Sequence, residues 1–119
     1  MDIEAYREFC LAFPKVTESF PFDEKVLVFK VANKMFALAD VEKFEYINLK
    51  CDPERAILLR EEYVEVKPGY HMSKKHWNSV YLTGILDDDF IKELIIHSYD
   101  LIVSGLPKKT RAEINQLRS

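Results

Sequence analysis

The chain has 119 residues, of which 48% are apolar and 31% are charged, and its formal net charge at pH 7 is −3. This composition excludes a disordered tail, and the length suffices for one core without metals or disulfides. The pI of about 5.6 differs from the strongly basic balance, above roughly 9, that is typical of nucleic-acid-binding domains.

The sequence also sets expectations for location and redox state. No apolar run approaches the roughly 20 residues of a membrane span, and the acidic start begins a helical pattern instead of a signal peptide. We therefore expect a cytoplasmic protein. Cys10 and Cys51 match no metal or redox spacing, so we expect two buried thiols, with a disulfide or a catalytic cysteine as the alternatives.

The first residues predict a helix and then an extended arm. Asp2 can cap the helix, and Pro14 ends it. Ser19–Phe22 is expected to be a short edge strand or arm, because Pro21 cannot donate a hydrogen bond within a central strand.

An antiparallel meander is expected next. Residues 26–31 and 34–39 have strand patterns and flank Ala32-Asn33, where asparagine tolerates the positive φ of a tight hairpin turn. Residues 44–50 supply a further strand, with Tyr46 and Asn48 on the same face. Strands joined by such short turns pair antiparallel.

The second half alternates helices with extended segments. Asp52-Pro53-Glu54 is a strong helix start, and Asp87-Asp88-Asp89 opens the longest helix. From about residue 107 the pattern predicts a short basic helix or, alternatively, a frayed tail. Residues 1–119 are thus predicted to be a single α+β domain. Its architecture is a two-layer sandwich with helices on one face of an antiparallel sheet, in the order α-β(3)-α-β(2)-α.

One stretch combines basic and aromatic residues, and we call residues 67–80 the basic-aromatic segment. Pro68 fixes φ and Gly69 accepts a positive φ, so we expect a sharp turn there. The segment contains three lysines, no acid and the only tryptophan. Ammonium groups can neutralise phosphates and flat rings can stack on bases, so the leading hypothesis is a DNA-binding protein with weak, phosphate-directed contacts. The candidate residues are Lys67, Tyr70, His71, Lys74, Lys75, His76 and Trp77, together with Lys108, Lys109 and Arg111 near the C-terminus.

This hypothesis requires the two basic regions to form one positive surface, and it requires Trp77 to be exposed. A lone tryptophan at the start of a strand also fits a core position. Two further hypotheses stay open: a protein-interaction module that uses a sheet face or edge, and a small-ligand pocket around Tyr70, His71, His76 and Trp77. A monomer and a homodimer are both compatible with the sequence.

The sequence argues against an enzyme and against a bound cofactor or metal. His71 and His76 are five residues apart, a spacing that neither a helix nor a strand brings to one metal. Ser73 and Ser79 flank His76, but no nucleophile motif and no glycine-rich phosphate loop is present.

Several short blocks carry a resemblance to a known family. They are Val28–Val31 with Lys34–Phe36, Leu49–Glu54, Pro68–Met72, Lys74–Asn78, and Ser98–Leu101 with Leu106–Lys109. In this order, over nearly the whole chain, they resemble the MmcQ/YjbR family of small bacterial proteins. One departure is Lys15, where family members often have a glycine. The resemblance implies an α-β-β-β-α-β-β-α fold akin to the frataxin (CyaY-like) and secretion-chaperone-like sandwiches. For function it implies a proposed DNA-binding, double-wing role, with no catalytic residues to carry over.

Overall fold

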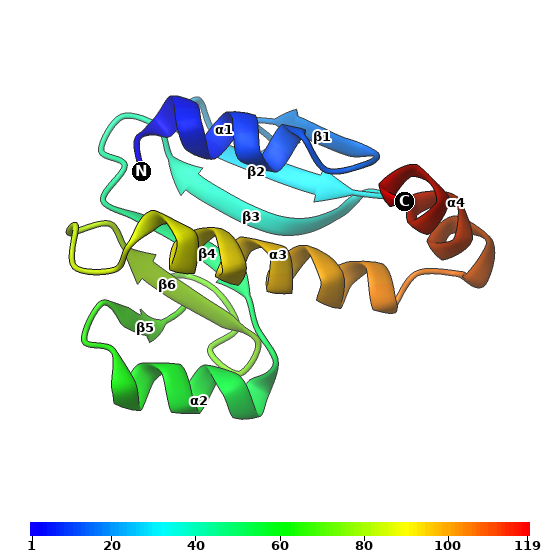
Figure 1. Cartoon of the computed structure of the whole chain (residues 1–119). Helices are drawn as coiled ribbons and strands as arrows, with labels where there is room; N and C mark the ends of the chain where they lie inside the picture. The colour runs from blue at the N-terminus through cyan, green and yellow to red at the C-terminus, as the bar shows by residue number, and fades with distance from the viewer.

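Six strands form one antiparallel sheet in the computed structural model, which describes residues 1–119 (Figure 1). The strands lie in the order β1-β2-β3-β4-β6-β5. Their bounds are β1 Val16–Ser19, β2 Val26–Val31, β3 Lys34–Asp40, β4 Tyr46–Lys50, β5 Val66–Pro68 and β6 Trp77–Tyr81. The helices are α1 Ile3–Leu11, α2 Pro53–Glu62, α3 Asp88–Ser104 and α4 Lys108–Arg118. The predicted α+β class is confirmed. None of the helices is both long enough and apolar enough to cross a membrane.

The chain differs from the predicted element order at two places. Four strands precede α2 instead of three, because β1 pairs with β2 from Val16 opposite Val31 to Ser19 opposite Val28. β1 therefore ends at Ser19, the first residue of the predicted Ser19–Phe22 arm, and Pro21 lies outside the paired residues. The C-terminal segment is the helix α4 and not a frayed tail.

Several local signals act as predicted. Ala32 and Asn33 both have positive φ, 49° and 66°, as the tight turn between β2 and β3 requires. The Asp52 side chain caps α2 by accepting from the Arg55 amide at 3.1 Å. Lys15 has a φ of 60°, so it occupies the left-handed conformation that a glycine adopts without strain. Its ammonium group pairs with the carboxylate of Glu113 in α4.

The core lies between the sheet and α1, α2 and α3, in one cluster of 24 buried residues. Aromatic rings join the layers: Tyr6 of α1 meets Phe29 edge-on at 5.4 Å, and Tyr99 of α3 meets Phe36 in the same way at 5.4 Å. Both cysteines are buried free thiols, as expected. Burial raises the pKa of both thiols, that of Cys51 to about 11, so both are protonated at neutral pH.

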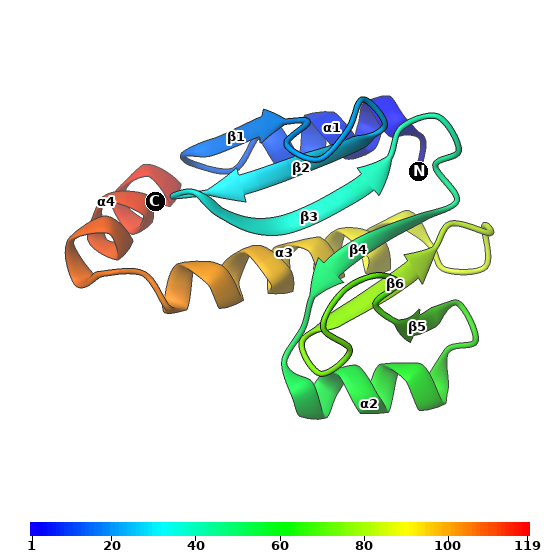
Figure 2. The same ribbon diagram turned by 180° about the vertical axis from the view of Figure 1, so that it is seen from behind.

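The other face of the sheet carries no helix (Figure 2). A smaller apolar cluster of Val28, Leu38 and Trp77 lies on it. One row of directly paired residues crosses all six strands of this open face: Ser19, Val28, Leu38, Asn48, Ser79 and Lys67. The row changes from apolar side chains on β2 and β3 to polar side chains on β4 and β6. The open face therefore has an apolar part next to a polar part.

Ser98 is the polar link between α3 and the sheet. This fully buried hydroxyl donates to the Phe36 carbonyl at 2.5 Å and accepts from the Lys50 amide at 2.9 Å. It therefore satisfies one backbone group on β3 and another on β4, which the packed helix would otherwise leave without a partner.

Replacing this serine tests the link. We expect Ser98→Ala to lower the free energy of unfolding by about 1–3 kcal/mol, because two buried backbone groups lose a partner. Ser104→Ala is the matched control, since the exposed Ser104 hydroxyl only bonds Leu101 within the same helix, and it should change stability by less than about 0.5 kcal/mol. Urea unfolding measures both. Equal stabilities for the two variants would contradict this role of Ser98.

Candidate functional site

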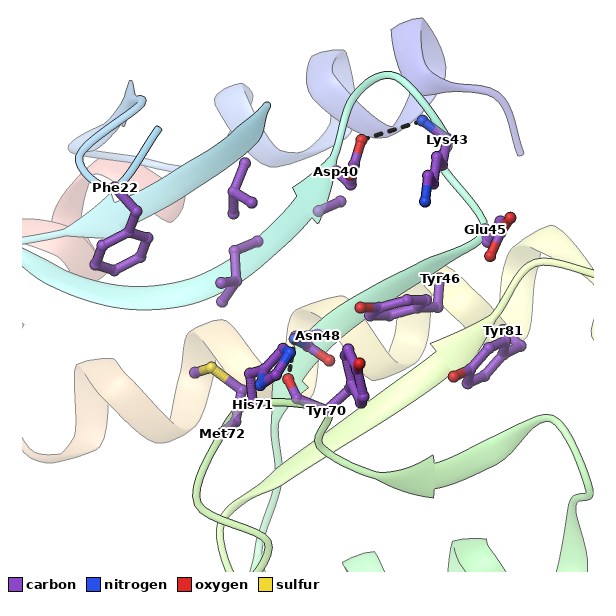
Figure 3. Close-up of a pocket in the computed structure, with 13 residues that line it drawn as sticks. Phe22, Asp40, Lys43, Glu45, Tyr46, Asn48, Tyr70, His71, Met72 and Tyr81 are labelled. Atoms are coloured by element: carbon purple, nitrogen blue, oxygen red, sulfur yellow. Dashed lines mark hydrogen bonds between the residues drawn. The ribbon is translucent and has the colours of Figure 1, made fainter. Parts of the chain in front are cut away.

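A groove of about 700 Å³ runs over the open face of the sheet (Figure 3). Strands β3, β4 and β6 supply one part of it, and the loop from Gly69 to His76 supplies another. The lining residues are Phe22, Val26, Leu38, Ala39, Asp40, Lys43, Glu45, Tyr46, Asn48, Tyr70, His71, Met72 and Tyr81. The groove is therefore apolar towards β2 and β3, and aromatic towards β4 and β6.

Three tyrosines from three segments gather at the aromatic end. Tyr46 and Tyr81 are direct partners on β4 and β6, and their ring centroids are 5.0 Å apart. Tyr70 comes from the loop and stands nearly perpendicular to Tyr46, at 86° and 6.1 Å (Figure 3). The His71 ring lies 4.0 Å from that of Tyr70. We call Tyr46, Tyr70 and Tyr81 the tyrosine cluster.

The pKa of Tyr46 is raised above its ordinary value. Burial is the largest cause, followed by the neighbouring phenols Tyr81 and Tyr70 and then by the carboxylates of Asp40 and Glu45. The Tyr46 hydroxyl thus stays protonated at neutral pH, and the charges that act on it are acidic.

A polar clamp holds the loop over the sheet, and it consists of the Asn48 and Ser79 side chains and the backbone of Tyr70. The Tyr70 amide donates to Ser79 Oγ at 2.9 Å, and Asn48 Nδ2 donates to the Tyr70 carbonyl at 3.2 Å. Ser79 Oγ in turn donates to Asn48 Oδ1 at 2.5 Å. Both side chains are buried. The clamp satisfies every polar group that it uses and fixes the residue that carries the Tyr70 ring.

Close packing at Gly69 supports the clamp. A Cβ atom on Gly69 would lie 2.7 Å from Trp77 Cβ and 3.0 Å from the Trp77 carbonyl oxygen, so any side chain there would push the loop off the sheet. The prediction that Gly69 supplies a positive φ is wrong. That conformation belongs to His71, with a φ of 60°, and Gly69 is required for close approach instead.

Arg60 of α2 anchors the far end of the loop. Its guanidinium donates to Asn78 Oδ1 at 2.7 Å, to the Trp77 carbonyl at 3.2 Å and to the Lys74 carbonyl. All three acceptors are uncharged. The helix thus fixes the start of β6 and the end of the loop together.

The rim of the groove carries two carboxylates and one ammonium group, those of Asp40, Glu45 and Lys43. None of these three side chains takes part in any of the six ion pairs of the protein. Asp40 Oδ1 accepts from the backbone amides of Glu42 and Lys43, which holds this carboxylate at the groove. The charge of the lining residues is therefore net negative.

The structure brings some of the predicted nucleic-acid residues together. Tyr70 and His71 line the groove, and Lys67 Nζ lies 5.9 Å from the centroid of the Tyr81 ring. Lys75 and His76 are exposed on the loop. Lys74 Nζ is held by the Gly69 carbonyl at 2.9 Å. Trp77 is 8% exposed and packs with Val28 and Leu38, so it occupies a core position and presents no ring for stacking.

The structure does not bring the two basic regions together. Lys108, Lys109 and Arg111 are exposed on α4. In both views α4 lies beyond the C-terminal end of α3, beside the turn from β2 to β3, whereas the loop joins β5 to β6 near α2 (Figures 1 and 2). The physical reason is the ten-residue α2 together with β5 and β6, which extend the sheet away from α4.

Sequence reasoning missed most of the groove. Tyr46, Asn48, Tyr81 and Ser79 were not proposed as site residues. The available signal was the shared face of Tyr46 and Asn48 on one strand, where polar and aromatic residues alternate with the buried Ile47 and Leu49. The register that places Tyr81 and Ser79 opposite them was not visible in the sequence.

Comparison with known proteins identifies the family. The YjbR family model matches residues 11–101. The chain belongs to the YjbR family. All groove-lining residues fall within the matched range, and α4 lies outside it.

Two Escherichia coli relatives match this YjbR-family chain over nearly their whole length. It is 37% identical to Escherichia coli K12 YjbR over 118 residues, 98% of this chain and all of that one. It is also 37% identical to Escherichia coli O157:H7 YbdF over 112 residues, 93% and 92% of the two chains. Both relatives are described as uncharacterized proteins.

Solved structures share the fold. Deinococcus radiodurans DR2400, which has the domain DUF419, superposes with a TM-score of 0.89 at 37% identity, covering 96% of this chain and 88% of that one. A Pseudomonas syringae protein superposes with a TM-score of 0.72 at 27% identity, covering 85% and 98%. The α+β architecture is thus common to crystal structures of this group.

The polar clamp predicts the effect of removing Asn48. Asn48→Ala should lower the free energy of unfolding by about 1–3 kcal/mol, since the Tyr70 carbonyl and the Ser79 hydroxyl each lose a buried partner. The control is Asn115→Ala on the exposed side of α4, with an expected change below about 0.5 kcal/mol. Urea unfolding gives both values, and an Asn48→Ala protein as stable as the control would rule out the clamp.

Proposed function

We propose that this YjbR-family protein is a non-enzymatic binding protein that holds a small ligand in the groove on the open face of its sheet. The tyrosine cluster carries this proposal, because its rings come from three segments and lie against one another, and the polar clamp fixes the backbone of Tyr70. A site that is already formed does not have to order its side chains on binding, and that saves free energy.

The size and lining of the groove support a small ligand. Its volume of about 700 Å³ lies within the range of roughly 300–1,000 Å³ that is usual for ligand pockets. Eight of the 13 lining residues are hydrophobic, and the polar groups lie mainly at one rim. Such a lining suits a ligand with one flat or apolar part and one polar end.

The chemistry of the candidate nucleophiles supports a binding role without catalysis. Ser79 Oγ is fully buried and already donates to Asn48 and accepts from Tyr70, so it has no capacity left for a base. Cys51 and His97 line a second cavity, but its volume is about 10 Å³, room for about one water molecule. The raised pKa of Cys51, about 11, also keeps that thiol from acting as a nucleophile.

Nucleic acid is the second candidate. Exposed Lys75 and His76 lie on the same loop as Tyr70 and His71, and aromatic rings on an open sheet can stack on the bases of a single strand. The carboxylates of Asp40 and Glu45 on the rim oppose a polyanion. The basic residues of α4 lie elsewhere, so few phosphates would be neutralised and the binding would be weak and salt-sensitive.

Titration with indole, a neutral planar probe, tests the proposed function by NMR. We expect shifts confined to the groove, at Leu38, Tyr46 and Met72. Tyr70→Ala should weaken indole binding about two- to tenfold, the value of one aromatic contact. Two exposed phenylalanines form a matched pair: Phe22→Ala, in the groove, should weaken binding, and Phe20→Ala, outside it, should not. Shifts that are absent, or that fall outside the groove, would contradict the proposal.

The same titration with a short oligothymidylate distinguishes nucleic-acid binding from the binding of a small ligand. On our proposal the oligonucleotide binds no more tightly than indole at 150 mM salt. Tighter binding that weakens with added salt and is lost in a Lys74→Glu, Lys75→Glu double variant would favour nucleic acid instead.

A further inference from the structure

We infer that the groove recognises a quaternary ammonium group, such as a trimethylammonium head, which lies against Tyr46 and Tyr70 at the rim that carries Asp40 and Glu45. This inference rests on the proposed function, because it names the chemical class of the ligand that the groove would take. Three features of the groove support it: the ring arrangement, the charge of the rim and the apolar lining.

The ring arrangement suits a cation. A cation is attracted to an aromatic face within about 6 Å of the ring centroid. The centroids of Tyr46 and Tyr70 are 6.1 Å apart and their planes are nearly perpendicular, so the two rings form a corner. A group that sits in this corner lies within reach of both centroids at once.

The protein itself places a cation on the third ring of the cluster. Lys67 Nζ lies 5.9 Å from the centroid of Tyr81, and Lys67 is not a lining residue of the groove. Tyr81 therefore already has an internal ammonium group over its ring. The His71 ring lies 4.0 Å from Tyr70, so an external cation would share the corner of Tyr46 and Tyr70 with this imidazole.

The rim has the charge that a cation needs. Lys43 is the only lysine or arginine among the lining residues, against the two carboxylates of Asp40 and Glu45, and none of these three side chains takes part in an ion pair. The raised pKa of Tyr46 reflects the same negative surroundings, after burial and the neighbouring phenols. A phosphate or carboxylate ligand would meet two carboxylates here, whereas a cation gains from them.

The apolar lining favours a quaternary over a primary ammonium group. Eight of the 13 lining residues are hydrophobic. A primary ammonium carries three hydrated N–H donors and loses that hydration on entering an apolar site, at a cost. A quaternary ammonium has no N–H donors and presents methyl groups to the rings, so it fits this lining better.

Three probes with the same two-carbon skeleton test the inference by NMR titration of the full chain. They are choline, its uncharged isostere 3,3-dimethylbutan-1-ol, and ethanolamine, which has a primary ammonium. We expect choline to bind at least about tenfold more tightly than either of the other two, which is about 1.4 kcal/mol. The shifts should centre on Tyr46 and Tyr70.

Variants of exposed residues connect the result to the groove without risk to the fold. Tyr70 is 54% exposed, so Tyr70→Phe should keep choline binding, because the ring face remains, and Tyr70→Leu should weaken it about tenfold. Glu45→Gln should weaken choline binding severalfold at low salt and leave 3,3-dimethylbutan-1-ol unaffected.

The outcomes separate the inference from the proposed function. Equal affinity for choline and 3,3-dimethylbutan-1-ol would overturn the recognition of a cation. Equal affinity for choline and ethanolamine would overturn the recognition of the methyl groups and indicate a simple ion pair with the rim carboxylates. In both cases indole binding would still support the proposed function. If neither choline nor indole shifts the groove resonances, both proposals fall.

Discussion

The polar clamp of Asn48, Ser79 and the Tyr70 backbone is the interaction on which the open face of this protein depends. Two buried polar side chains on neighbouring strands would be costly without partners. They satisfy each other and also both backbone groups of one loop residue. The loop therefore cannot leave the sheet without breaking both hydrogen bonds between the Tyr70 backbone and these side chains. The clamp thus ties one wall of the groove to the sheet.

The helices and the core on the opposite face of the sheet support this arrangement. Three helices bury one face of the sheet in a single core cluster, and Arg60 extends from one of them to hold the start of β6 and the end of the loop. The close approach of Gly69 to Trp77 then sets the height of the loop above the strands. With one face stabilised by the core, the opposite face is free to carry aromatic and polar residues that would otherwise weaken the fold.

Much of the fold followed from local signals, whereas the groove did not. Asn33 predicted its hairpin and Asp52 its helix start, because a turn and a cap depend on residues close in sequence. The groove depends on the register of β4 with β6, which pairs Asn48 with Ser79 across 31 positions. Gly69 shows the same limit: the sequence predicted a positive φ there, whereas the packing against Trp77 shows that the glycine is needed for close approach.

Hydrogen exchange at the Tyr70 amide tests the account most directly. The residue lies in a loop and its side chain is 54% exposed, so without the clamp its amide would exchange as fast as that of any surface loop. The account predicts slow exchange, with protection close to that of the amides of β6, because opening this hydrogen bond requires the clamp to break. Exchange at the rate of an unprotected loop amide would contradict a preformed groove.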